Sequence, residues 1–192
     1  MTMAPQQSKI DELIRRLDEA VMVADDAGRC RNVKKVLTDI VGSGGSFVPE
    51  SFMRTATGHY ARRLLHRDPA GRYTVLVMVW DRGQGTPLHD HAGTWCCECV
   101  YLGRIRVTSF SALGGDPELD LVEFRQETVV HAGVGEAGAL IPPFEYHILE
   151  NAGDEPAVTI HVYGEEMKHC HVFEATEGSS YRRHYRELTY TE

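Results

Sequence analysis

The sequence predicts a mainly β domain of the sandwich or barrel type, preceded by short N-terminal helices. Helical periodicity is confined to about the first 55 residues, where two segments carry apolar residues at intervals of three and four. From about residue 56 to 175, short segments rich in β-branched and aromatic residues alternate with Gly, Pro and Asp signals. Many short strands at regular spacing are typical of a sandwich or a barrel.

Two helices are expected first. One covers residues 8–21 with Ser8 as its N-cap, and the other covers residues 32–45, where Gly42 suits a C-terminal end. A further short helix is expected around Phe52. Each long helix carries one apolar stripe, made of Ile10, Leu13, Ile14, Leu17 and Val21 in the first and of Val33, Val36, Leu37 and Ile40 in the second.

The strands are expected to follow without an internal repeat or a linker. A single domain over residues 1–192 is the simplest organisation for this length. The polar and aromatic tail, residues 176–192, fits no helix or strand pattern and is left unassigned. The expected strands cover residues 60–65, 72–80, 99–102, 104–113, 121–130, 138–143, 147–151 and 157–164.

Composition narrows the possible partners. The formal net charge of -8 and a pI near 5.7 argue against nucleic acid and anionic membranes as main partners. No apolar run approaches the roughly 20 residues of a membrane helix, and the N-terminus lacks the pattern of a signal peptide. The five cysteines include the adjacent Cys96 and Cys97, which suits a reducing cytoplasm better than a disulfide framework. We expect a monomer or a small homo-oligomer.

Ten histidines make a metal site worth seeking, and two of them lie in the stretch TPLHDHAGTWCCECVYLG, residues 86–103. His89 and His91 point to the same face of an extended segment, so both imidazoles can reach one ion. Imidazole suits zinc, iron, copper and nickel, so the ligand type does not name the metal. Taken alone, such a spacing is as common for two solvent-facing histidines of a loop as for a pair of metal ligands. A zinc cluster that uses CCEC is disfavoured because no paired-cysteine knuckle occurs elsewhere.

Two stretches, GQGTPLHDH with CCECVYLG and later PPFEYHILEN, resemble the two signature motifs of the cupin superfamily. The resemblance implies a double-stranded β-helix, or jelly-roll barrel, with His89, His91 and His147 as three metal ligands. Many cupins carry a glutamate ligand a few residues after the histidine pair. In this chain Cys96 occupies the position of that glutamate. Glu98 lies two positions on, so a slipped register would restore a carboxylate.

The pattern of a cysteine at that position together with three histidines resembles that of the cysteine dioxygenase family, which is the thiol dioxygenase branch of the cupins. The resemblance covers nearly the whole chain after about residue 55. It implies an iron(II) enzyme that adds both atoms of O2 to L-cysteine and gives cysteine sulfinic acid. It also aligns Cys96 with the cysteine that in animal enzymes becomes linked through a thioether to a tyrosine, here Tyr163.

Alternation in VTIHVYG puts Thr159, His161 and Tyr163 on one face of a strand. Polar atoms inside an apolar barrel need partners, so these three side chains satisfy one another or act as a relay. The resemblance implies a relay in which Thr159 orients His161 and His161 orients the Tyr163 hydroxyl toward the metal. Cys97 and Cys99 are expected to be small buried hydrophobes, and Cys170 matches a family cysteine near the pocket mouth.

An arginine on a strand that enters the barrel suits a carboxylate, because guanidinium forms two parallel charge-assisted hydrogen bonds with it. Either Arg62 or Arg63 must point outward. The resemblance selects Arg62, two residues after Tyr60, as the substrate carboxylate anchor. Relatives acting on 3-mercaptopropionate carry glutamine there, so arginine favours cysteine. 3-Mercaptopropionate or another small thiol as substrate, and a non-enzymatic metal-binding cupin sensor, remain as alternatives.

Overall fold

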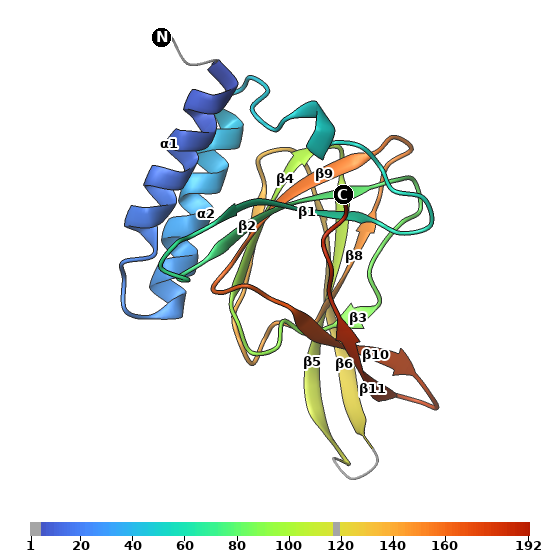
Figure 1. The fold of residues 1–192 in the computed structure, drawn as a ribbon. Coiled ribbons are helices and arrows are strands. Elements are labelled where there is room, and N and C mark those ends of the chain that lie inside the picture. The colour runs from blue at the N-terminus through green and yellow to red at the C-terminus, as the bar shows by residue number, and fades with distance from the viewer. Residues whose placement is uncertain (1–4, 117–119) are drawn as a thin grey trace.

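The computed structural model describes residues 5–116 and 120–192 and shows two helices packed against a β-barrel (Figure 1). The helices are α1 (Pro5–Ala20) and α2 (Asp26–Gly42), followed by a 3₁₀ helix at Glu50–Phe52. The strands are β1 (Ala61–Arg67), β2 (Thr74–Trp80), β3 (Leu88–His89), β4 (Cys96–Leu102), β5 (Ile105–Asp116), β6 (Leu121–Ala132), β7 (Ala137–Leu140), β8 (His147–Asn151), β9 (Ala157–Tyr163), β10 (His169–Ala175) and β11 (Ser180–Glu187).

The strands form two sheets. Five run in the order β1-β2-β9-β4-β7, and the other six form a closed ring in the order β10-β11-β6-β5-β8-β3. This mainly β barrel behind two N-terminal helices confirms the predicted fold class, a double-stranded β-helix or jelly roll. Each of the eight predicted strands has a counterpart.

Alternation divides the five-stranded sheet into a helix-facing side and a barrel-facing side. On β2 and β9, Val75, Val77, Val79, Val158, Ile160 and Val162 pack with the helices. Cys97 and Cys99 on β4 join the same apolar cluster, while Cys96 packs among barrel residues. The strand phase therefore changes between His89 and Cys96, where Ala92 and Gly93 adopt positive φ angles of 53° and 81°.

The helix boundaries differ from the prediction at two places. Ser8 lies inside α1, so the prediction that it caps this helix is wrong. Helix α2 begins six residues earlier than expected, because the Asp25 side chain accepts a 2.7 Å hydrogen bond from the Gly28 backbone N–H. The N-cap residue Asp25, which precedes the apolar stripe in the sequence, thus sets the start of α2.

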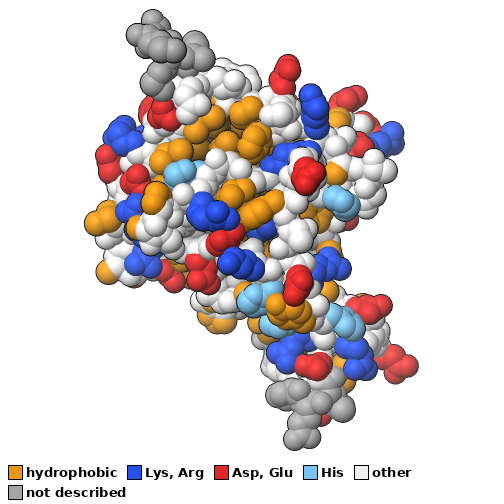
Figure 2. All heavy atoms as spheres, in the orientation of Figure 1, with side chains coloured by type: hydrophobic (Ala, Val, Ile, Leu, Met, Phe, Trp, Pro, Cys, Tyr) orange, Lys and Arg blue, Asp and Glu red, His pale blue; other side chains and the backbone are white. Residues whose placement is uncertain are grey.

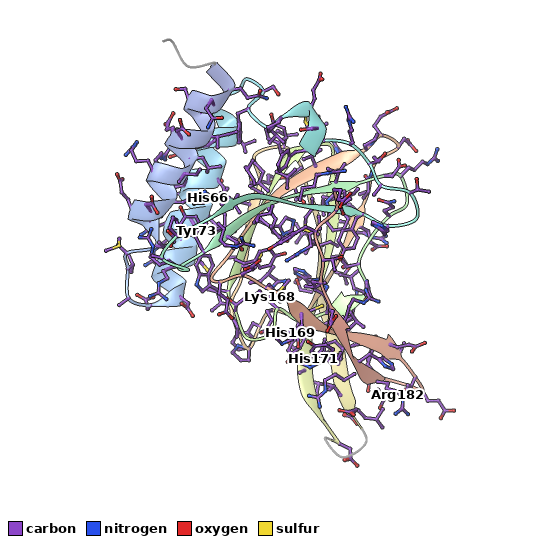
Figure 3. The ribbon with its side chains drawn as sticks, in the orientation of Figure 1. His66, Tyr73, Lys168, His169, His171 and Arg182 are labelled. Atoms are coloured by element: carbon purple, nitrogen blue, oxygen red, sulfur yellow. The ribbon has the colours of Figure 1, made fainter. Side chains whose placement is uncertain are left out.

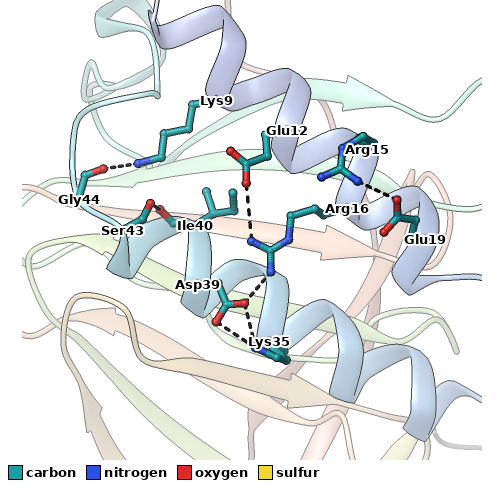
Figure 4. Close-up of polar contacts among 10 residues, drawn as sticks. All are labelled: Lys9, Glu12, Arg15, Arg16, Glu19, Lys35, Asp39, Ile40, Ser43 and Gly44. Carbon is teal, nitrogen blue, oxygen red and sulfur yellow. Dashed lines mark hydrogen bonds and ion pairs between the residues drawn. The ribbon is translucent and has the colours of Figure 1, made fainter.

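Polar contacts also join the two helices (Figure 4). Arg16 on α1 lies 2.5 Å from Asp39 on α2, and Lys35 pairs with the same carboxylate at 3.0 Å. Such solvent-exposed pairs contribute only about 0–1 kcal/mol each. The apolar stripes, including the fully buried Leu13 and Leu37, hold the helix pair to the sheet.

The tail left unassigned in the sequence contains a strand. β11 pairs with β10 and with β6, and so completes the closed ring. After it the chain runs beside β1, where the Thr191 backbone N–H donates to the Arg62 carbonyl at 2.8 Å. β11 has no apolar alternation because most of its side chains are exposed, so the pattern that reveals a half-buried strand is absent.

The surface carries both signs of charge. On the face shown in Figure 2, Lys and Arg side chains interleave with Asp and Glu side chains and form no continuous basic patch. Within the described residues, no helix is long and apolar enough to cross a membrane.

Candidate metal centre and its pocket

Three histidines converge inside the barrel. His89 ends β3 and His147 begins β8, and the two strands pair so that these residues are direct neighbours. His91 follows in the turn after β3. One nitrogen from each ring lies within 4.8 Å of the others, and all three side chains are buried. Among the described residues this is the one group of three or more candidate ligands, and it contains neither Cys96 nor Glu98.

The protonation state of these histidines suits metal binding. Burial lowers the pKa of His89, and it lowers the pKa values of His91 and His147 well below the usual value. The rings are therefore neutral at pH 7, which is the form that binds metal. His89 Nδ1 lies 3.1 Å from the Pro87 carbonyl and donates its proton there. The unprotonated Nε2 is then the atom available to bind a metal.

Unpartnered nitrogens support the same conclusion. Nδ1 of His91 and both ring nitrogens of His147 are buried without a hydrogen-bond partner in the described structure. A buried polar group left unpaired costs about 1–3 kcal/mol. Neutral imidazoles that each bring one nitrogen within 4.8 Å of the others, as His89, His91 and His147 do, suit one cation.

The side chains of Thr159, His161 and Tyr163 form a hydrogen-bonded row along β9. Thr159 Oγ1 lies 2.8 Å from His161 Nε2, and the Tyr163 hydroxyl lies 3.4 Å from His161 Nδ1. The Trp80 indole N–H donates to Thr159 Oγ1 at 2.9 Å. The row therefore begins at Trp80, which sequence reasoning did not include. Trp80 lies on β2, and no local spacing relates it to Thr159.

Trp80 favours one direction of hydrogen bonding along this row. An indole N–H only donates, so Thr159 Oγ1 accepts there and keeps its own proton available for Nε2 of His161. The other ring nitrogen, Nδ1, then carries the imidazole proton. It faces the Tyr163 hydroxyl oxygen, which leaves the Tyr163 proton free to point into the pocket.

Cys96 and Tyr163 lie opposite each other on the paired strands β4 and β9 and pack in one cluster. Burial raises the pKa of the Cys96 thiol well above its usual value, and it does the same for the Tyr163 hydroxyl. Both groups are therefore neutral at pH 7. Glu98, two residues on, instead lies beside His161, with Oε2 3.6 Å from Nδ1.

Arg62 and Arg63 point to opposite sides of β1. Arg63 donates to the backbone carbonyls of Phe52 and Arg54, away from the metal pocket. Arg62 is 5% exposed and lines the pocket together with Tyr60, His89 and His147. Its Nη2 donates to the Met167 carbonyl at 2.8 Å, and its guanidinium carbon lies 4.9 Å from the ring centre of Tyr190. The remaining donors of Arg62 are available to an anion.

A comparison with known protein families identifies the family of this chain. The family model described as cysteine dioxygenase type I matches residues 2–176. The chain belongs to the cysteine dioxygenase type I family. Human cysteine dioxygenase type 1 is 25% identical over 120 residues, which are 62% of this chain and 58% of the human protein. The zebrafish (Danio rerio) protein is 24% identical over 135 residues, 68% of this chain and 65% of that protein.

The aligned part thus spans less than two thirds of the length of these curated cysteine dioxygenases. Among solved structures, a double-stranded β-helix domain protein from Klebsiella pneumoniae is 18% identical, with a TM-score of 0.46. That alignment covers 65% of this chain and 93% of the Klebsiella chain.

In this member of the cysteine dioxygenase family, further pocket residues come from the last two strands and their surroundings. Cys170 of β10 lines the pocket, as do Met167, Leu188 and Arg186. Arg186 is exposed, and its side chain forms no hydrogen bond or ion pair with a described residue. Sequence reasoning missed Arg186 because the tail was not recognised as a strand.

The other face of β10 supports the ligand turn. His169 and His171 lie close together on this strand (Figure 3), and neither lines the metal pocket. His171 Nδ1 lies 2.9 Å from Oδ2 of Asp90, the residue between the ligands His89 and His91. The His171 backbone N–H also donates to Asp90, at 2.8 Å. The Asp90 backbone N–H donates in turn to the His171 carbonyl at 3.1 Å, so three hydrogen bonds tie the ligand turn to β10.

Proposed function

We propose that this protein is an iron(II)-dependent thiol dioxygenase that adds both atoms of O2 to the sulfur of L-cysteine and forms cysteine sulfinic acid. One observation carries the proposal: two members of the buried three-histidine group, His89 and His147, line the same pocket as Arg62. A facial set of neutral ligands suits a non-haem iron that must keep open positions. An arginine with free donors suits a substrate that carries a carboxylate.

Each pocket residue then has a stated task. His89, His91 and His147 hold the iron, which supplies open coordination positions and the electrons that activate oxygen. Arg62 binds the substrate carboxylate and, with Tyr60, fixes the pose of the thiol. The Tyr163 proton, directed into the pocket by Thr159 and His161, donates a hydrogen bond to the reacting groups. The five cysteines, all buried and free, suit a reducing compartment such as the cytoplasm.

Oxygen uptake by the iron-loaded protein tests this function directly. With L-cysteine we expect one O2 consumed for each sulfinate formed, measured with an oxygen electrode and by product mass. The panel should include 3-mercaptopropionate, which lacks the amine, and cysteamine, which lacks the carboxylate. A preference for 3-mercaptopropionate would identify that thiol as the substrate. Tight thiol binding without oxygen uptake would instead favour a metal-binding sensor.

A thioether between Cys96 and Tyr163 is a second expected outcome. The two residues face each other across β4 and β9, and Cys97 and Cys99 point to the helices. We expect turnover with iron, cysteine and O2 to yield a chain two hydrogens lighter, with a digest peptide that joins Cys96 to Tyr163. Oxygen accepts the two electrons and two protons that are removed.

Matched variants check the identity of the linked cysteine. Cys96→Gly should abolish the linked species and keep appreciable activity, because the hydroxyl of Tyr163 remains. Cys97→Ala should leave the link intact, since its thiol packs on α2. A linked peptide that contains Cys97 would contradict this assignment.

A further inference from the structure

A second cavity reaches the hydrogen-bonded row at Thr159, whereas His161 and Tyr163 line the metal pocket. It holds about 280 Å³ and is lined by residues of β4, β5, β6 and β7. The two cavities share a single lining residue, Leu149. The walls are mostly apolar, with Val100, Val107 and Val130 among them, and Glu98 and Thr159 also line it. This outer cavity therefore reaches the row by a path that avoids the metal.

Glu98 is an unusual residue for such a place. It is 8% exposed, and its Oε2 has no hydrogen-bond partner in the described structure. The same oxygen lies 3.6 Å from His161 Nδ1. Burial raises the pKa of the Glu98 carboxyl to about 8, and no neighbouring cation opposes this effect. Glu98 is thus a neutral carboxylic acid at pH 7.

Nδ1 of His161 has two oxygens within reach. The Tyr163 hydroxyl lies at 3.4 Å and Glu98 Oε2 lies at 3.6 Å. Since Nδ1 carries one proton, it makes one strong hydrogen bond at a time. A carboxylate is a much stronger acceptor than a neutral carboxyl or a phenol oxygen. The charge of Glu98 therefore decides which oxygen receives the proton.

We propose that Glu98 is a positioning residue that switches the hydrogen bond of His161. When Glu98 is neutral, the Nδ1 proton goes to Tyr163 and the Tyr163 proton points into the metal pocket. When Glu98 gives its proton to solvent through the outer cavity, the carboxylate takes the Nδ1 hydrogen bond and Tyr163 loses its orientation. The consequence for catalysis rests on the proposed dioxygenase function, but the protonation state of Glu98 does not.

The other titratable groups around Glu98 do not change charge near pH 8. On β9, burial lowers the pKa of His161 to about 3 and raises that of Tyr163 well above its usual value. Cys96 on β4 has a pKa raised well above its usual value by burial. Burial raises the pKa of Cys99, also on β4, to about 12. Elsewhere in the cavity, β5 and β6 contribute Ser109 and Val130, and the exposed Glu136 accepts from the Gly133 backbone N–H.

The sign of the pH effect follows from the raised pKa. Well below pH 8, Glu98 is fully protonated and in its active, neutral form. This form is lost as the pH rises through that value. A single ionisation near pH 8 lowers kcat/KM roughly tenfold between pH 7 and pH 9. In Glu98→Gln, which stays neutral, the ratio of kcat/KM at these two pH values should stay near one. Glu98→Asp, which keeps an acid, should restore the alkaline decline.

Glu136→Gln is the matched control, because Glu136 lines the same cavity but its carboxylate accepts from the Gly133 backbone N–H and has no hydrogen bond to a described residue of the row. It should keep the wild-type pH profile. An alkaline decline that persists in Glu98→Gln, or its absence from the wild type, overturns the proposal.

Infrared titration of the metal-free protein gives a readout that needs no turnover. We expect one carboxylic acid C=O band that disappears with a midpoint near pH 8 and is absent from Glu98→Gln. If Glu98→Gln does not fold, Glu98→Leu replaces it in both experiments. A protein that shows this band but consumes no oxygen with any thiol would refute the dioxygenase function and keep the neutral Glu98. A protein that consumes oxygen but lacks the band would refute the role of Glu98 alone.

Discussion

Replacing His147 with alanine should reduce iron affinity by more than about 100-fold, because loss of a direct ligand costs more than loss of a residue that only orients one. His147 supplies one of three donor nitrogens within 4.8 Å of one another, and neither of its own nitrogens has another partner. Oxygen uptake should fall with iron content. The measurement is metal analysis after anaerobic reconstitution, followed by assay at saturating cysteine.

The same result is expected for His89→Ala and for His91→Ala. His171→Ala is the matched control, since this histidine bonds Asp90 beside the ligands but lies outside the donor group. It should keep most of its iron. If two of the three ligand variants retain full iron and activity, the assignment of the metal centre is wrong.

Arg62→Gln should weaken catalysis selectively for thiols that carry a carboxylate. Loss of charge-assisted hydrogen bonds costs about 2–4 kcal/mol, which corresponds to roughly 30-fold to 900-fold in kcat/KM. Most of this change should lie in KM for cysteine, because Arg62 holds the carboxylate and not the sulfur. Cysteamine, which has no carboxylate, should respond much less.

Arg63→Gln separates binding from folding. Arg63 is the neighbour of Arg62 on β1, but it donates to the Phe52 and Arg54 carbonyls. Its replacement should lower the thermal midpoint and leave KM for cysteine nearly unchanged. Equal losses for cysteine and cysteamine in Arg62→Gln would mean that Arg62 supports the fold only.

The candidate site was predictable where its residues lie close together in the sequence. His89 and His91 are two positions apart, and Thr159, His161 and Tyr163 alternate on one strand, so elementary strand geometry places each set on one face. The change of phase before Cys96 was harder, because it depends on a turn with two positive φ angles at Ala92 and Gly93.

Residues that join the site through tertiary contacts were not predictable. Trp80 reaches Thr159 across 79 residues of sequence, and Arg186 enters the pocket from a strand that lacks apolar alternation. The sequence suggested Glu98 as a slipped metal ligand, but the structure puts its carboxyl beside His161 and outside the metal group. In each case the decisive partner lies on another strand, which periodicity does not report.

The hydrogen bonds between β1 and the segment after β11 affect how the protein is made. Arg62 N–H donates to Thr191 Oγ1 at 3.0 Å, and the two residues are 129 positions apart. While the chain is still growing on the ribosome, β1 and the helices emerge long before β11 and Thr191. The pocket wall that contains Arg62 and Tyr190 therefore closes only after residue 191 has left the exit tunnel, because such distant contacts form last. In a nascent chain, the three ligand histidines should consequently have left the ribosome before the substrate pocket is complete.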